Sequence, residues 1–441
     1  MKMTVAPAPH LRRVGLIITV ASLVAIAIAT LSPETGPVVG SHFCLICGSV
    51  GTVDAILNVI LFVPLGVGLA LGGARGKNAL VWAFALSALI ETTQLVLISG
   101  RHSTIGDVVT NTLGGALGFA IVRYQALWLR PPPRAAGNLA LGWAAIWLII
   151  QAISSYGFTL SLPHSQYYGQ IARELGNLAV FPGTVLSARI DGVPIPNTAL
   201  DDSRAVERLL LASATVAASV VPGKPTPKIA PIVRVADARR REILLLAQDG
   251  DRFIFGVRTG AAVLRVRSPF FALAKVFPLG LSGDSSPRES LTLTARYAAS
   301  GVRIRAHGSS TGSDLDIPIN ASLGWTLWLP FQWVIGGTRA ERVISSIWIA
   351  FLVIPVGYWT FHLREPSSPN RARSEPAIAL LFGTALLIAG LALIPYVFGL
   401  SGAPFVDWLA TFVGLLFGYS LGGGMARAGW AATPVSGDPG R

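Results

Sequence analysis

Long apolar stretches alternate with short polar segments over much of this chain. Crossing a bilayer takes about 20 apolar residues, because an α-helix rises 1.5 Å per residue. Eight stretches approach that length: 14–32, 54–72, 79–98, 104–123, 138–155, 342–362, 377–397 and 404–424. The pattern predicts a polytopic α-helical membrane protein with about eight spans. The first stretch is long for the apolar core of a signal peptide, so we expect it to be retained as the first span.

Residues 156–340 follow a different pattern. Short runs of Val, Ile, Leu, Thr and Phe alternate there with polar residues, and turn signals such as Asp249-Gly250 separate them. This rhythm is typical of antiparallel strands. The predicted strands are 230–236, 242–248, 252–258, 262–267, 290–297 and 301–306. With no strong helical pattern in this segment, we expect an inserted all-β sandwich of the jelly-roll type.

The basic residues indicate the topology. With the N-terminus inside, the short outer loops 33–53, 99–103 and 398–403 contain a single basic residue, Arg101. The inner segments hold thirteen: Lys2, Arg12, Arg13, Arg75, Lys77, Arg123, Arg130, Arg134, Arg364, Arg371, Arg373, Arg427 and Arg441. Cytoplasmic loops carry an excess of Lys and Arg. We therefore expect both termini inside and residues 156–340 outside the cytoplasm.

Composition supports this interpretation. Only 13% of the residues are charged, against about 25% in soluble domains. The formal net charge of +13 would suit a nucleic-acid partner. Because many of the basic residues sit in short loops between apolar runs, we interpret them as a topology signal and predict the lipid bilayer, not nucleic acid, as partner.

Polar residues inside the spans are the candidate functional residues. Ionisable groups are costly in a bilayer and are functional candidates by default. Three spans carry an acid–amide pair three or four residues apart, which places each pair on one helix face. The set is Asp54 with Asn58, Glu91 with Gln94, Asp107 with Asn111, and Arg101 in the loop between spans three and four. From the span directions, all of them lie toward the outer leaflet.

These residues resemble the VanZ-like family of bacterial membrane proteins. The resemblance covers about residues 14–123 and rests on the order of the set across three spans. It consists of Asp54-x3-Asn58-x3-Phe62-x-Pro64-x-Gly66, Glu91-x2-Gln94, and Arg101-x5-Asp107-x3-Asn111-x2-Gly114-x3-Gly118. The family is named for a protein linked to resistance to the glycopeptide teicoplanin. The resemblance implies a place in the bacterial cytoplasmic membrane and a role near the cell envelope, but no settled reaction.

The outer segment is similar to concanavalin-like or laminin-G-like sandwiches. The similarity rests on the strands around Ile232–Val235, Ile243–Gln248 and Phe253–Thr259 and on the turn between the last two. No sugar-site or calcium-site motif accompanies it. It implies a glycan- or protein-binding ectodomain.

The last predicted span repeats the residue spacing of the fourth. The pattern Asp407-x3-Thr411-x2-Gly414-x3-Gly418 has the spacing of Asp107-x3-Asn111-x2-Gly114-x3-Gly118. The echo has apolar residues at 391–394 where Glu91 and Gln94 would stand, so we expect a copy that kept packing and lost the polar site. The predicted organisation is a VanZ-like four-helix domain at 1–130, a cytoplasmic linker and fifth span at 131–155, the β domain at 156–340, three C-terminal spans at 341–425, and a cytoplasmic tail at 426–441.

Cys44 and Cys47 are the two cysteines of the chain and stand in the first outer loop. An extracytoplasmic location favours a disulfide between them. Free thiols, redox chemistry and a metal remain as alternatives. A zinc site usually takes four ligands, and with His42 this loop supplies three, so we predict no metal site.

Three functions fit these residues. The first is binding of a polar envelope ligand or lipid headgroup in an outer-leaflet pocket, with a glycan, a lipid-linked precursor or a protein bound at the β domain. The alternative is a membrane-embedded enzyme that uses the carboxylates on a lipid-linked or peptide substrate; no catalytic residue or cofactor can be named. A proton-linked transporter is the third, although no acid lies in the inner half of spans two to four. The purely structural alternative is that these polar residues only form hydrogen bonds between helices and so fix the bundle.

Overall fold

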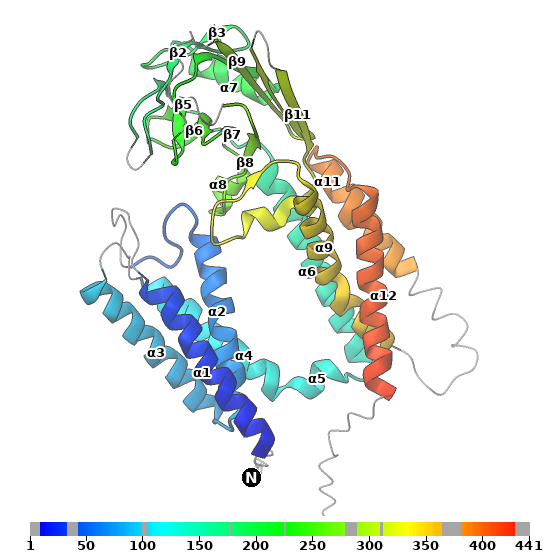
Figure 1. The fold of residues 1–441 in the computed structure, drawn as a ribbon. Coiled ribbons are helices and arrows are strands. Elements are labelled where there is room, and N and C mark those ends of the chain that lie inside the picture. The colour runs from blue at the N-terminus through cyan, green and yellow to red at the C-terminus, as the bar shows by residue number, and fades with distance from the viewer. Residues whose placement is uncertain are drawn as a thin grey trace, which may run out of the picture. The chain divides into compact units, whose positions relative to one another are not determined.

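The computed structural model describes residues 9–32, 43–98, 104–175, 178–224, 226–277, 289–308, 312–363 and 381–427. It shows apolar helices of spanning length and a separate region with two β-sheets (Figure 1). The predicted fold class, a helical membrane protein with an inserted β domain, is confirmed. Arg101 and His102 lie outside the described residues.

Seven described helices are long and apolar enough to cross a membrane. They are α1 (Pro9–Leu31), α2 (Gly51–Leu71), α3 (Gly76–Leu97), α4 (Ile105–Arg123), α6 (Pro133–Phe158), α9 (Arg339–Phe361) and α12 (Phe405–Arg427). A shorter apolar helix covers Leu381–Val397, within the predicted seventh span, and includes the π-helical turn η2 (Ala389–Leu393) and α11 (Ile394–Val397). The short helix α5 (Gln125–Leu129) follows α4.

Glycines bring α2 and α4 into close contact. A Cβ atom at Gly114 or Gly118 of α4 would clash with the backbone of α2, at the carbonyl oxygens of Val59 and Val63 respectively. A Cβ at Gly66 of α2 would in turn clash with the carbonyl oxygen of Gly115. Small residues allow two backbones to approach this closely. Between membrane helices there is no hydrophobic driving force, so the van der Waals packing of such close contacts drives their association. The packing holds α2 and α4 side by side.

The β domain consists of two six-stranded sheets. One has the order β1-β5-β6-β7-β8-β12 and the other β11-β10-β9-β4-β2-β3, and neighbours are antiparallel except β8 and β12. The first contains β1 (Tyr167–Ile171), β5 (Ala230–Asp237), β6 (Glu242–Asp249), β7 (Arg252–Val257), β8 (Phe270–Leu273) and β12 (Val334–Ile335). The second contains β2 (Thr184–Ile190), β3 (Val193–Pro194), β4 (Thr215–Val221), β9 (Leu291–Ala298), β10 (Gly301–His307) and β11 (Gly312–Pro318).

The first sheet is buried on both faces. Every residue from Ile243 to Gln248 of β6 is buried, which explains the unbroken apolar run in the sequence. On one face, Leu245 and Ala247 belong to a cluster that also includes Ile254. Between the sheets, the rings of Phe271 (β8) and Tyr297 (β9) meet edge-on with centroids 6.0 Å apart. β9 alternates buried and more exposed residues, as expected for a half-buried strand.

One strand predicted for the β domain was wrong. Residues 262–267 do not form a strand: α8 (Gly260–Leu264) begins before them and ends at Arg265, which has φ +54°. Tertiary packing decides this, because the backbone of Tyr156 contacts Gly260 so closely that a Cβ there would clash. The two-sheet domain also contains α7 (Ser203–Leu211), between β3 and β4. Asp202 caps α7 by accepting from the backbone N–H of Ala205 at 2.8 Å.

The chain divides into two compact units. One contains residues Met1–Gln125, Tyr156–Ile319 and Gly324–Thr338, which include α1–α4 and both sheets. The other contains Ala126–Ser155, Asn320–Leu323 and Arg339–Arg441, with most of α6, α9, Leu381–Val397 and α12. The domain boundaries drawn from the sequence stay a prediction.

Candidate functional site

A cavity of about 780 Å³ lies at the outer ends of α2 and α4 as the predicted topology orients them. Six of the seven residues that the sequence singled out line it. They are Asp54, Asn58, Glu91, Gln94, Asp107 and Asn111. The seventh, Arg101, lies outside the described residues. Side chains from three helices thus meet around one space, and the ligand-binding role of these residues stays a prediction.

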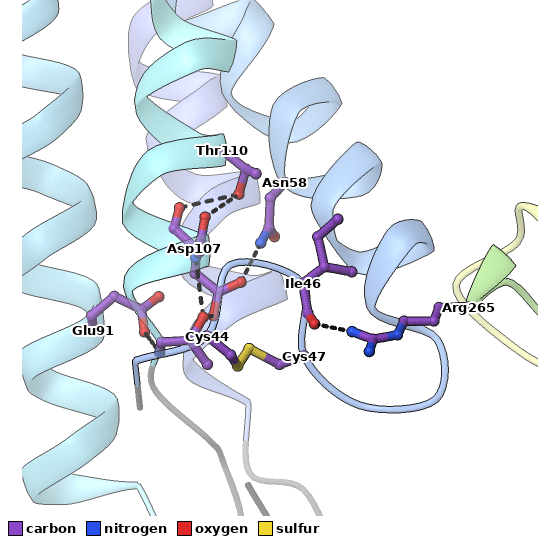
Figure 2. Close-up of a disulfide and its surroundings, with 10 residues drawn as sticks. Cys44, Ile46, Cys47, Asn58, Glu91, Asp107, Thr110 and Arg265 are labelled. Carbon is purple, nitrogen blue, oxygen red and sulfur yellow. Dashed lines mark hydrogen bonds between the residues drawn. A yellow bond between two sulfur atoms is a disulfide. The ribbon is translucent and has the colours of Figure 1, made fainter. Parts of the chain in front are cut away.

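Asp107 is held by hydrogen bonds from two neighbouring side chains (Figure 2). Its Oδ1 accepts a hydrogen bond from the side-chain amide of Asn58 at 2.6 Å, and its Oδ2 accepts one from the hydroxyl of Thr104 at 2.7 Å. The Thr104 hydroxyl oxygen also accepts from the backbone N–H of Asp107 at 3.1 Å, as a helix N-cap does. These bonds orient Asp107 and join the start of α4 to α2.

Glu91 and Gln94 tie α3 to its neighbours. Glu91 is 7% exposed, and its Oε2 accepts from the backbone N–H of Thr104 at 3.0 Å. Gln94 is 6% exposed and donates from Nε2 to the carbonyl oxygen of Thr30 in α1 at 2.8 Å. Both side chains therefore have a fixed orientation at the cavity wall.

Asn111 is a buried residue of the cavity wall. Its Nδ2 donates to the hydroxyl of Ser87 at 2.9 Å, which links α4 to α3. The residue is 2% exposed, and its Oδ1 has no hydrogen-bond partner among the described residues. A buried carbonyl oxygen without a partner is costly.

Residues 16–129 match the family model described as VanZ/LLP1. This range covers α1 to α4 in full except for the first turns of α1, together with all six cavity residues. Residues 16–129 form a VanZ-like domain. The chain is therefore a multi-pass membrane protein with a VanZ-like part, as the ordered polar set predicted.

Searches of curated proteins and of solved structures found no match to this chain. The concanavalin-like or laminin-G-like character of the β domain thus stays a prediction. The two sheets themselves are established by their strand pairing.

A disulfide loop forms part of the rim of the VanZ-like domain's cavity. The structure joins Cys44 and Cys47, whose Cα atoms are 5.7 Å apart. Cys47 lines the cavity, and the carbonyl oxygen of Cys44 accepts from the backbone N–H of Gly106 at 3.1 Å. The guanidinium of Arg265 donates to the carbonyl oxygen of Ile46 (Figure 2). The loop thus contacts both the first turn of α4 and the β domain.

Several cavity residues escaped the sequence analysis of the VanZ-like domain. Thr104 stands three residues before Asp107, a spacing that signals a helix N-cap and could have identified it. Arg267 and Pro330 also line the cavity, although they follow α8 and precede β12 in the β domain. Arg267 donates from Nε to the carbonyl oxygen of Leu329 at 3.2 Å. No local pattern connects such distant segments.

Metal binding has no support in the described part of the chain. Within it, no group of three or more His, Cys, Asp or Glu side chains could hold a metal ion. What the cavity of the VanZ-like domain offers is hydrogen-bonding groups: carboxylates, amides and hydroxyls held by helices.

Proposed function

We propose that the VanZ-like domain binds a polar envelope ligand or a lipid headgroup in this cavity. The observation that carries the proposal is the convergence of six polar residues from α2, α3 and α4 on one space of about 780 Å³. Ligand sites in proteins typically occupy about 300–1,000 Å³. A headgroup with several hydroxyl, amine or phosphate groups has a suitable size and chemistry.

Most polar side chains of the cavity wall are satisfied within the protein, as in most native networks. Asn58, Asp107 and Glu91 do have partners within the protein. The Oδ1 atom of Asn111 does not.

The basic residues support an outer-leaflet position for the cavity. With N-terminus and C-terminus in the cytoplasm, α2 and α4 run inward, so their first turns lie near the outer surface. Asp54 and Asp107 stand in these first turns. The site would then open toward envelope components in the bacterial cytoplasmic membrane, with the β domain outside.

For the β domain we propose an envelope glycan or a protein as partner. A hollow of about 350 Å³ on the second sheet includes Arg296, Arg303 and Asp316 in its wall. Arg303 and Asp316 form an ion pair at 2.5 Å. Planar charged groups of this kind make directional hydrogen bonds to hydroxyl groups, which supports a glycan.

Retention of lipid by the purified full chain tests the cavity. Native mass spectrometry would compare phosphatidylglycerol and a polyprenyl phosphate as probes, on wild type and on the isosteric variants Glu91→Gln and Asp107→Asn. We expect weaker retention of one probe in both variants. Asp407→Asn, outside the cavity, is the control and should retain the probe as wild type does. Unchanged retention in all variants would contradict the proposal.

The same assay separates binding from catalysis. Chemical conversion of the polyprenyl phosphate by wild type, lost in Asp107→Asn, would favour the enzyme alternative, in which a carboxylate serves as general acid or base.

A further inference from the structure

The contact between α9 and α12 repeats the contact between α2 and α4. A Cβ at Gly414 of α12 would clash with the carbonyl oxygen of Ala350, as one at Gly114 would with that of Val59. A Cβ at Gly418 would clash with the carbonyl oxygen of Ile354, as one at Gly118 would with that of Val63. Ala350 and Ile354 have the spacing of Val59 and Val63, so the two helix pairs share one register.

The reciprocal contact is also repeated. A Cβ at Gly357 of α9 would clash with the carbonyl oxygen of Leu415, just as Gly66 faces that of Gly115. Each helix carries a proline two residues before this glycine, Pro355 in α9 and Pro64 in α2. Chance similarity between Gly-rich helices does not explain agreement at the interface from both sides.

The hydrophobic cores use corresponding helix positions. In the first bundle, Phe62 and Leu65 of α2 pack with Ile26 of α1 and with residues of α3. In the second, Val353 and Val356 of α9 pack with Trp147 of α6 and with residues of Leu381–Val397. Val353 and Val356 lie at the positions of Phe62 and Leu65 when the glycine contacts are matched. The helix order is thus the same in both.

Asp107 has a counterpart in the second helix set, but the polar residues around it do not. Asp407 stands in the first turn of α12, as Asp107 does in α4, and accepts from the hydroxyl of Ser346 in α9 at 2.9 Å. The positions of Asn58 and Glu91 are taken by Ile349 and Leu391, and both of these side chains are fully buried. The second helix set therefore has apolar packing where the first has the cavity wall.

We infer that α6, α9, Leu381–Val397 and α12 form a second VanZ-like bundle, which keeps the packing register and lacks the polar cavity. Four spans per bundle give both copies the same orientation across the membrane, as in parallel repeats. The β domain is inserted between the first two helices of the second copy, the connection that carries the Cys44–Cys47 disulfide in the first. Among the described residues, the polar cavity of the first copy thus has no counterpart in the second, and the β domain is an insertion in the sequence of the second copy.

Thiol labelling of matched positions tests the loss of the cavity in the second copy. In the full chain, with Cys44 and Cys47 joined, Asn58→Cys and Ile349→Cys would each supply one free thiol. A small cationic methanethiosulfonate should label Asn58→Cys about tenfold faster or more, because a buried thiol reacts only through local opening. Equal rates at the two positions would overturn the inference. This readout needs no ligand, so it is independent of the proposed function.

Cross-linking tests the register of the second copy. The pair Phe361→Cys with Gly422→Cys should form a disulfide under mild oxidation, because a Cβ at Gly422 would lie 2.9 Å from the Cβ of Phe361. A second pair, Ser346→Cys with Asp407→Cys, probes the other end of the helices. The control pair Phe361→Cys with Gly424→Cys should not react, because Gly424 faces open space. Cross-linking of the control pair with failure of both test pairs would refute the shared register.

Discussion

The side-chain amide of Asn58 in α2 donates to Oδ1 of Asp107 in α4 at 2.6 Å, across 49 residues of sequence. Hydrogen bonds of this kind between membrane helices contribute about 0.6 kcal/mol on average and at most about 1.7. A double-mutant cycle with Asn58→Ala and Asp107→Ala, followed by unfolding in detergent, should give a coupling energy in this range. Pairing Asn58→Ala with Asp407→Ala is the control and should be additive.

Gly118 sets the distance between α2 and α4. A Cβ there would clash with the backbone of Val63, and overpacking of this kind costs about 1–3 kcal/mol. Gly118→Ala should therefore lower the thermal unfolding temperature of the purified protein. At Gly142 of α6 a Cβ would meet nothing within 4 Å, so Gly142→Ala should leave the thermal unfolding temperature unchanged. Equal effects of the two substitutions would argue against close packing at Gly118.

The Cys44–Cys47 disulfide closes a short loop at the rim of the cavity. Closing a loop of this length restricts the unfolded chain by about 2 kcal/mol at most. The double variant Cys44→Ser with Cys47→Ser should lose stability of that order. Dithiothreitol should destabilise wild type to the same extent and have no effect on the variant. A stable wild type in dithiothreitol would show that the disulfide adds nothing.

Asp237 links the stability of the β domain to pH. Burial disfavours its ionisation, but hydrogen bonds from the backbone N–H and the guanidinium of Arg241 outweigh burial and lower its pKa. A carboxyl whose folded pKa lies below its unfolded pKa stabilises the protein fully above the unfolded value, about 4, and this contribution is lost as the pH falls through the folded value.

Asp237→Asn should therefore cost about 1–3 kcal/mol at neutral pH, the range for hydrogen bonds to a charged group, and weaken the loss of stability in acid. Hydrogen exchange at β5 and β6 in the full chain at several pH values measures this. Asp314→Asn is the matched control: the Asp314 side chain is 63% exposed in its ion pair with Arg305, so we expect little change. A wild-type pH profile in Asp237→Asn would reject the assignment.

The predicted topology places Ser187 of β2 outside and Gln125 of α5 inside. Both residues are exposed in the structure. In intact cells, a membrane-impermeant maleimide should label Ser187→Cys, and should label Gln125→Cys only after permeabilisation. The opposite result would place the β domain in the cytoplasm and reverse the orientation of every span.

The sequence alone located seven helices of spanning length and the polar residues within them. Polar groups such as Asp107 and Glu91 are conspicuous within apolar stretches because the bilayer makes them costly. Helical spacing then placed Asn58 beside Asp54 on one face. Five of the six expected strands formed, because alternation of apolar and polar residues is a local property of the chain.

Only the tertiary structure decided which of these groups meet. Arg267 and Pro330 reach the cavity from the β domain, and no periodicity reports a contact between distant segments. Packing of Tyr156 against Gly260 replaced an expected strand with α8. The similarity between α4 and α12 was visible in the sequence. The similarity between α2 and α9 became visible only through the glycine contacts. Val59 and Ala350 take part in these contacts with their backbone carbonyl oxygens, which every residue type has.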